Sequence, residues 1–224
     1  MKIQKTKDKY NKDILIDQNG FQVMMEWEKP YMEALIKKLK PRGDVLEIGF
    51  GLGYSASAVQ KYKIKSHTII EDNSTVLKDL KKWSKKQLHK VNIIEGTWQN
   101  KLKTLGKFDC IFFDDAPHED YPDPDDTRIY NFYYQLLNKH VNKNARLSWY
   151  CERPIYWVVH PSVKWSLDLF KIKKPLNCAY APPRGGFCIP LLIFARGTTN
   201  NIVPFVINKN NQLRIGFSNN NFSV

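Results

Sequence analysis

Short apolar runs alternate with amphipathic segments along most of the chain. Runs typical of buried strands lie at residues 44–48, 67–71, 91–95, 108–113 and 145–151. Between them, apolar residues at helical spacing predict helices at about 54–62, 74–84 and 127–140. Strands that alternate with helices predict a Rossmann-like α/β fold, in which a mostly parallel sheet has helices on both faces.

The segment before the first of these strands reads as a helix. In residues 22–40, apolar side chains such as Val23, Trp27 and Tyr31 recur at intervals of four, which is the spacing of a helix face. Pro30 is compatible with the start of a second helical segment, because proline is tolerated in a first turn.

The two ends of the chain differ from the alternating centre. Further strands are predicted near 174–179 and 187–195, and the tail 198–224 is predicted to hold a β-hairpin with an Asn-rich turn. Residues 1–21 are interpreted as an N-terminal lid or extension. We expect a single domain over residues 1–224, since no linker or repeat divides it.

A glycine loop follows the first predicted strand in the sequence "DVLEIGFGLGY". Its glycines stand at every second position, Gly49, Gly51 and Gly53. Glycine lets a backbone adopt positive φ and admits a ligand to close contact, and ligands of such sheets bind at the carboxyl ends of the strands. A nucleoside is indicated, because Glu71 ends the next strand, where a carboxylate accepts both ribose hydroxyls.

The spacing of this loop distinguishes two classes of nucleoside ligand. The dinucleotide fingerprint is G-x-G-x-x-G, and Tyr54 stands where its third glycine belongs. The form G-x-G-x-G, with Glu47 just before it, suits S-adenosylmethionine better, because that cofactor has no pyrophosphate to hold.

A pair of acids, Asp114-Asp115, ends the strand predicted at 108–113. An Asp in this position is often only a turn cap. Two functional interpretations compete with that one. "DDAP" is a loose version of the [DN]-P-P-[YF] motif of enzymes that methylate base amines. Alternatively, Asp114 handles a cationic nitrogen nucleophile.

Composition adds a large positive charge to this picture. The formal net charge is +13, which is compatible with an acidic partner such as nucleic acid. Much of it is lysine in "KKLK" and "KKWSKK", interpreted as solvated helix faces because neither run has the interleaved aromatics of a base-stacking surface. Nucleic acid is therefore not favoured as the partner.

Several classes of protein are not indicated. The longest apolar run, "CIPLLIFA", is far shorter than the ~20 residues that span a bilayer, and no secretory signal is visible. No two of the four cysteines have C-x-x-C spacing, so reduced thiols are expected and no metal site. A cytoplasmic location is expected, with the nucleus left open.

Six ordered motifs resemble those of the guanidinoacetate N-methyltransferase family, which includes a related fungal protein-arginine methyltransferase. The resemblance runs from about Met24 to Cys151 in order and spacing. The motifs are "MMEWEKPYM", "VLEIGFGLG", "HTIIEDN", "EGTWQN", "CIFFDDAP" and "YNFYYQLLNKH" followed by "LSWYCE"; "GGFCIPLLIFARG" resembles the last strand of the family. The resemblance implies a class I S-adenosylmethionine-dependent methyltransferase fold.

The resemblance also implies roles for individual residues. Glu28 and Asp114 would grip a substrate guanidinium, and Asp114 would take its proton. The cofactor would be held by the loop with its preceding acid and by five other positions: Glu47, Gly49, Phe50, Gly51, Leu52, Gly53, Met32, Glu71, Asp72, Thr97 and Trp98. Trp27 or Tyr31 would exclude water.

The chain departs from the family where the substrate's far end would bind. Asp115-Ala116 replaces Thr-Tyr after the strand-four acid, and Glu152-Arg153-Pro154 replaces an Asn-Leu-Thr turn, with Pro154 removing one amide donor. Glu152 is expected to meet a cationic group, such as the α-amine of free arginine. Guanidinoacetate, arginine and an arginyl side chain in a protein therefore all stay open as acceptors.

Two other functions remain as alternatives. One is a base-amine methyltransferase acting on RNA or DNA, which the positive charge and "DDAP" favour. The other is an inactive S-adenosylmethionine-binding subunit, against which the intact acids at positions 28, 47, 71 and 114 argue.

Overall fold

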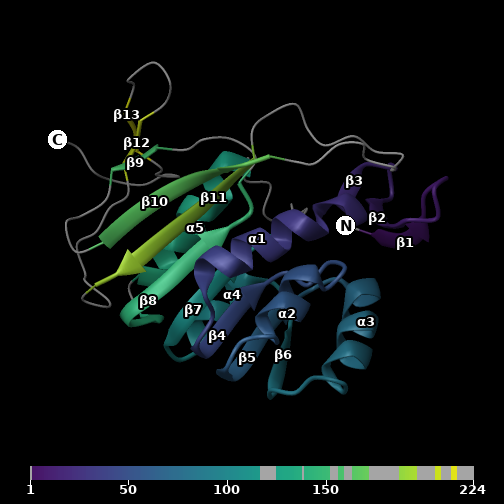
Figure 1. Cartoon of the computed structure of the whole chain (residues 1–224), viewed down its shortest axis with the longest axis horizontal. Helices are drawn as coiled ribbons and strands as arrows, with labels where there is room; N and C mark the ends of the chain where they lie inside the picture. Colours follow the sequence, from purple (N-terminus) through teal and green to yellow (C-terminus); the bar gives the residue numbers. More distant parts are fainter. Residues whose placement is uncertain are drawn as a thin grey trace.

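A seven-stranded sheet forms the centre of the protein (Figure 1). The computed structural model describes residues 2–116, 125–137, 139–151, 156–158, 163–171, 187–195, 205–207 and 213–215. The sheet contains β4 (Gly43–Ile48), β5 (Ile64–Glu71), β6 (Val91–Glu95), β7 (Phe108–Phe113), β8 (Val141–Trp149), β10 (Val163–Phe170) and β11 (Phe187–Phe194). Their order is β10-β11-β8-β7-β4-β5-β6. The five strands from β8 to β6 are parallel, whereas β11 and β10 are antiparallel additions.

Helices cover both faces of this sheet (Figure 1). Side chains alternate along a strand, so Cys110 and Phe112 of β7 belong to one hydrophobic cluster and Ile111 and Phe113 to the other. The first cluster includes residues of α1 (Lys29–Leu39), α2 (Tyr54–Val59) and α3 (Ser74–Ser84). The second includes residues of α4 (Trp98–Lys101), which is followed by η2 (Leu102–Thr104), and of α5 (Asp125–Leu137). The predicted α/β architecture with helices on both faces is confirmed.

The predicted elements of the centre agree with the structure, and the bounds of α3, β6 and β7 are those predicted. The prediction of a helix from residue 22 is wrong in its first part. Residues Gln22–Met25 form β3, Glu26–Glu28 form the short 3-10 helix η1, and α1 begins at Lys29. The recurrence of apolar side chains at intervals of four therefore runs across a strand, a turn and a helix. Pro30 lies in the first turn of α1, where its missing N–H has no helical partner to lose.

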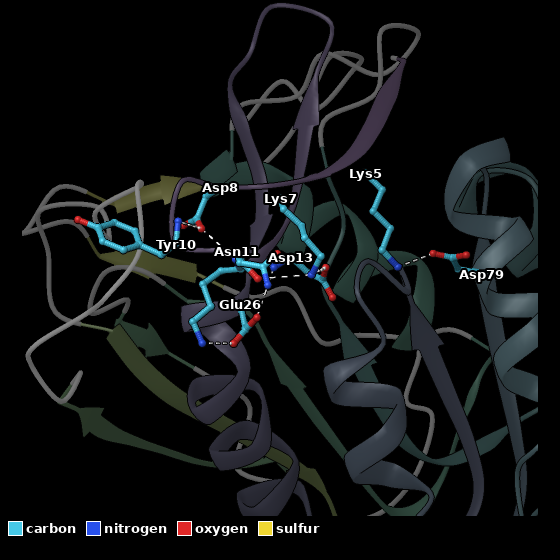
Figure 2. Close-up of polar contacts among 9 residues, drawn as sticks. Lys5, Lys7, Asp8, Tyr10, Asn11, Asp13, Glu26 and Asp79 are labelled. Atoms are coloured by element: carbon cyan, nitrogen blue, oxygen red, sulfur yellow. Dashed lines mark hydrogen bonds and ion pairs between the residues drawn. The ribbon is translucent and has the colours of Figure 1, made fainter.

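Residues 3–25 form a separate antiparallel sheet of β1 (Ile3–Lys7), β2 (Asp13–Asp17) and β3. The sequence patterns did not predict these strands. Figure 2 shows Lys5 of this sheet pointing toward Asp79 of α3, and Lys5 Nζ lies 2.6 Å from a carboxylate oxygen of Asp79. A second ion pair joins Lys12 Nζ to Glu26 Oε1 at 2.8 Å. Asp8 accepts two backbone N–H bonds that shape the turn between β1 and β2. The predicted N-terminal extension is thus a structured sheet beside α3.

The tail contains the predicted hairpin. β12 (Phe205–Ile207) and β13 (Leu213–Ile215) pair antiparallel, and β9 (Tyr156–Val158) adds a third strand. β10 was not predicted, and the strand predicted at 174–179 lies outside the described residues. Cys110, Cys151 and Cys188 are buried free thiols. In the part of the chain that the structure describes, no helix combines the length and apolar character needed to cross a bilayer.

Candidate active site

A cavity of about 500 Å³ opens at the carboxyl ends of the parallel strands. Its walls come from the ends of β4 to β8 and from the N-terminal sheet. β4 has β5 on one side and β7 on the other, so the order of strands reverses there. Ligands of open α/β sheets bind at this kind of reversal. The cavity therefore lies where the fold predicts a ligand.

The glycine loop packs tightly against its own chain. Gly49 has φ 81°, and a Cβ at this position would lie 2.1 Å from the carbonyl oxygen of Asp114. The Asp114 N–H in turn donates to the Ile48 carbonyl at 3.0 Å. At Gly51 a Cβ would lie 2.4 Å from Met24 Sδ. Glycine is required at these two positions because strand β7 and the N-terminal sheet approach the loop so closely.

Glu71, the last residue of β5, is buried beneath the loop. One carboxylate oxygen accepts the Phe50 N–H at 2.9 Å, and the other accepts the N–H groups of Asp72 and Asn73 at 3.0 and 2.8 Å. Burial raises the pKa of this carboxyl to about 7, despite these hydrogen bonds, which lower it. The oxygen that faces Phe50 keeps a lone pair for a further donor, such as a ribose hydroxyl.

Asp114 follows β7 and faces the cavity. Its side chain retains some accessible surface toward the cavity, but protein surrounds it on the other sides. Burial raises its pKa to about 7, and the nearby carboxylates of Glu47 and Asp115 add to this effect, which Arg128 partly opposes. A carboxylate in this position has an unusually strong preference for a proton or a cationic ligand.

Among the described residues, Asp115, unlike Asp114, is held by hydrogen bonds to other side chains of the protein. Its carboxylate accepts the Trp98 indole N–H at 2.8 Å, and Arg128 donates to its backbone carbonyl at 3.2 Å. These contacts fasten α4 and α5 to the end of β7. Asp114 is therefore the member of the acidic pair that is better placed to meet a ligand.

Glu28 enters the cavity from the turn before α1. It is 3% exposed, and its Oε1 accepts the Met25 N–H at 2.7 Å. One turn further on, the Tyr31 hydroxyl donates to the Cys188 carbonyl at 2.6 Å and accepts the Cys151 N–H at 3.0 Å. Tyr31 thereby fixes the start of α1 against β8 and β11. Glu28 is held on a rigid element.

The structure brings together eight of the predicted site residues around this cavity. They are Glu28, Gly49, Gly51, Glu71, Asp72, Thr97, Trp98 and Asp114. Met32, Glu47, Phe50, Leu52 and Gly53 do not line it, so their contact with the cofactor stays a prediction. Phe50 acts on the site through the N–H that it donates to Glu71. Glu152 lies outside the described residues.

Glu47 belongs to a buried polar group beneath the loop. Its Oε1 accepts the Ser55 hydroxyl at 2.5 Å, and its Oε2 lies 2.7 Å from His67 Nε2, at ion-pair distance but without the angle of a hydrogen bond. Ser55 is on α2 and His67 on β5, so Glu47 connects three elements. Its carboxylate also adds negative charge near Asp114.

Sequence patterns missed several residues of the cavity wall. Phe21, Val23 and Met24 reach it from the N-terminal sheet, while Trp149 and Tyr150 reach it from the end of β8. Trp149 and Tyr150 thus belong to the aromatic part of the wall, whereas Trp27 and Tyr31 do not line the cavity. The short alternating run "DILID" at 13–17 was the signal for the N-terminal sheet.

The cavity fits a nucleoside-containing cofactor. Its volume lies in the range of small-molecule sites. Glu71 offers a carboxylate acceptor for hydroxyl groups. The Thr97 hydroxyl oxygen is buried, and among the described residues it has no hydrogen-bond partner, although it belongs to the wall. A buried polar atom without a partner is costly, which indicates that a ligand supplies the bond.

Replacing Glu71 tests the cofactor site. Glu71→Ala should weaken S-adenosylmethionine binding by about tenfold or more, because hydrogen bonds to a charged acceptor contribute about 1.5–3 kcal/mol each. Calorimetric titration measures the change. Glu95→Ala is the matched control, since Glu95 is the residue opposite Glu71 at the end of β6 but is exposed and paired with Lys81. Equal affinities in both variants would contradict the assignment of Glu71 to the ribose.

The raised pKa of Asp114 predicts how stability depends on pH. Between about pH 4 and pH 7, the folded protein holds a proton that the unfolded chain releases, so the free energy of unfolding should fall as pH rises. Asp114→Asn removes this titration and should raise the free energy of unfolding at pH 8 by about 1–3 kcal/mol, with little change at pH 4. Urea unfolding at both pH values measures this. Asp168→Asn, at an exposed position, should have no such effect; destabilisation of Asp114→Asn at pH 8 would contradict the account.

Comparison with known proteins identifies the family of this chain. The sequence model of the family described as guanidinoacetate N-methyltransferase matches residues 2–156. Protein arginine N-methyltransferase 2 of Candida glabrata is 32% identical over 189 residues, which are 78% of this chain and 44% of that protein. The protein of the same name from Kluyveromyces lactis is 30% identical over 79% of this chain and 44% of its own length. The chain thus spans less than half the length of these relatives.

Solved structures agree in fold. An O-methyltransferase from Bacillus cereus, solved in complex with SAH, aligns with a TM-score of 0.51 and 11% identity over 76% of this chain and 82% of its own. Spermidine synthase from Thermotoga maritima aligns with a TM-score of 0.55 and 15% identity over 86% and 72%. The predicted class I methyltransferase fold is confirmed. The chain therefore belongs to the guanidinoacetate N-methyltransferase family.

Proposed function

We propose that this N-methyltransferase transfers its methyl group to a guanidino nitrogen, with an arginyl side chain or a small guanidino compound as acceptor. The observation that carries the proposal is the presence of two carboxylates, Glu28 and Asp114, in the wall of one cavity. They come from different elements, the turn before α1 and the end of β7. A guanidinium group is planar and presents N–H donors on several edges, which suits two carboxylates in this arrangement.

The charge of the cavity supports a cationic acceptor. Glu28, Glu71, Asp72, Asp114 and Asp115 all belong to its wall, although the chain as a whole carries a net charge of +13. Arg128 is the one Arg or Lys among the described residues that line it, and this side chain contacts Asp115. Crowded carboxylates repel one another, and a bound cation relieves that repulsion.

Proton transfer explains why a carboxylate with a raised pKa is useful. A guanidinium has a pKa of about 12.5–13.8, so prior deprotonation at pH 7 would cost roughly 8 kcal/mol. The acidity of the nitrogen rises as its bond to carbon forms, and Asp114 takes the proton on its carboxylate at that stage. Its raised pKa makes it a better proton acceptor than an ordinary Asp.

The remaining residues position the two reactants. Glu71, Thr97 and the loop from Gly49 to Gly51 would hold S-adenosylmethionine, which supplies an electrophilic methyl group on a sulfonium sulfur. Glu28 binds the other edge of the guanidinium and fixes the direction of attack. Trp149 and Tyr150 cover the substrate side and exclude water.

The relatives favour an arginyl acceptor among the guanidino compounds. The two sequence relatives reported above, at 32% and 30% identity, are both named protein arginine N-methyltransferase 2. Glu152-Arg153-Pro154 replaces the Asn-Leu-Thr turn that is expected to receive the carboxylate of guanidinoacetate. An acceptor without that carboxylate is compatible with this departure.

Labelled S-adenosylmethionine tests the acceptor directly. The protein is incubated with it and is separately offered guanidinoacetate, arginine, an arginine-containing peptide and RNA. Label should enter a guanidino acceptor. Asp114→Asn should lower kcat at least about 100-fold, because proton acceptance typically contributes 10²–10⁴-fold. Glu28→Gln should have a smaller effect on kcat and should raise KM for the acceptor.

Exposed positions supply the controls. Asp168→Asn and Glu33→Gln make the same chemical changes at exposed ion pairs and should leave turnover unchanged. The base-amine alternative predicts a different result, because a neutral amine needs only a hydrogen-bond acceptor, which Asn still provides. Label in RNA, with substantial turnover in both Asp114→Asn and Glu28→Gln, would contradict the paired-carboxylate mechanism.

A further inference from the structure

The end of the sheet opposite the cavity is strongly basic. Each of the five parallel strands is preceded by a loop at this end, and each loop or strand start carries exposed Lys or Arg side chains. We call these twelve residues the basic strip: Lys40, Arg42, Lys61, Lys63, Lys65, Lys85, Lys86, Lys90, Lys103, Lys107, Lys139 and Lys143. They are twelve of the 35 Lys and Arg residues of the chain.

The basic strip is continuous because its loops precede neighbouring strands. The order β8-β7-β4-β5-β6 places the loops side by side, although each is separated from the next in the sequence by a helix or turn. At about 4.8 Å between strands, the five strand starts extend over about 19 Å. Charges that are scattered along the chain are thereby gathered at one end of the sheet.

The acids of these segments are turned inward. Asp44 and Asp109 are the acidic residues among them, and both are half-buried. Asp44 accepts from Ser66 at 2.6 Å and Lys65 at 2.9 Å, whereas Asp109 accepts the Asp44 N–H and the Asn142 amide, both at 2.9 Å. Among the described residues, only Lys61 and Lys65 of the strip pair with a carboxylate, and the Arg42 guanidinium donates to the backbone carbonyl of Asn144.

The kinds of side chain in the basic strip indicate which class of anionic partner it binds. An anionic lipid surface is bound by basic residues together with an apolar face, and Leu88 is the single exposed large apolar side chain in these described segments. Stacking on bases needs exposed aromatic side chains, and these described segments present none. A broad array of lysines without apolar anchors is suited to the evenly spaced charges of a phosphodiester chain.

We propose that the basic strip binds the phosphodiester backbone of nucleic acid without reading its sequence. The strip lies at the opposite end of the strands from the cavity, so a bound strand leaves the catalytic cavity open. This inference does not depend on the identity of the methyl acceptor. It also gives a function to part of the positive charge of the chain. The lysine runs "KKLK" and "KKWSKK" alone did not indicate this surface, because the loops that form it are distant in the sequence.

Fluorescence anisotropy with a labelled single-stranded RNA of mixed sequence tests the proposal, with a DNA strand of the same sequence beside it. The wild-type protein should bind both with a Kd of about 10⁻⁴–10⁻⁶ M at physiological salt, and the affinity should fall steeply as salt rises. In the triple variant Lys63→Glu/Lys86→Glu/Lys90→Glu, the affinity at about 50 mM salt should fall at least tenfold. The slope of log K against log salt should shrink by about two, since each contact to a single strand contributes about 0.7.

A control with the same change in charge separates a surface from mere net charge. Lys2→Glu/Lys9→Glu/Lys78→Glu reverses three exposed lysines outside the strip and should retain most of the RNA affinity. Both variants should bind S-adenosylmethionine like the wild type, which shows that they are folded. Equal loss of RNA binding in the two variants would overturn the proposal. So would absence of binding at low salt, or tighter binding to phosphatidylserine vesicles or polyglutamate than to RNA.

Discussion

The close approach of β4 and β7 at Gly49 and Asp114 is the constraint on which the site depends. Only glycine leaves room for the Asp114 carbonyl at this point, and the hydrogen bond from the Asp114 N–H to Ile48 holds the two strand ends together. This close packing of the two strand ends brings the Asp114 carboxyl near Glu47 and Glu71 and away from bulk solvent. The raised pKa of Asp114, its preference for a cationic ligand and its proposed role as proton acceptor all follow from that packing.

The fold separates charge between the two ends of its parallel strands. Acids gather at the carboxyl ends around the cavity, and the strip of lysines gathers at the amino ends. Both groups come from loops that are distant in sequence, and the parallel sheet aligns them because every strand points the same way. A cationic acceptor and an anionic polymer can therefore be bound by one small domain without competition between them.

The centre of the fold could be predicted because its inner strands are buried on both faces and read as mostly apolar runs, as in β7. The N-terminal sheet was not predicted, because β1 is half-exposed and its side chains show no period. In addition, Val23, Trp27 and Tyr31 recur at the spacing of a helix face. Asp114 and Glu71 were recognisable as acids at strand ends. Glu28 was found only through the family resemblance, because a Glu before a helix resembles an ordinary surface residue. Met24, Trp149 and Tyr150 required the tertiary structure.

The central claim is that the Asp114 carboxyl is partly protonated in the free protein at pH 7 and gives up its proton when a cation binds beside it. S-adenosylmethionine and S-adenosylhomocysteine differ in one methyl group and one positive charge, so calorimetric titration of both at pH 7, in buffers of different ionisation enthalpy, isolates that effect. With Asp114 near pKa 7 in the free protein, binding of S-adenosylmethionine should release more protons than binding of S-adenosylhomocysteine, by up to about half a proton. Equal proton release for the two ligands, or proton uptake with S-adenosylmethionine, would contradict the account.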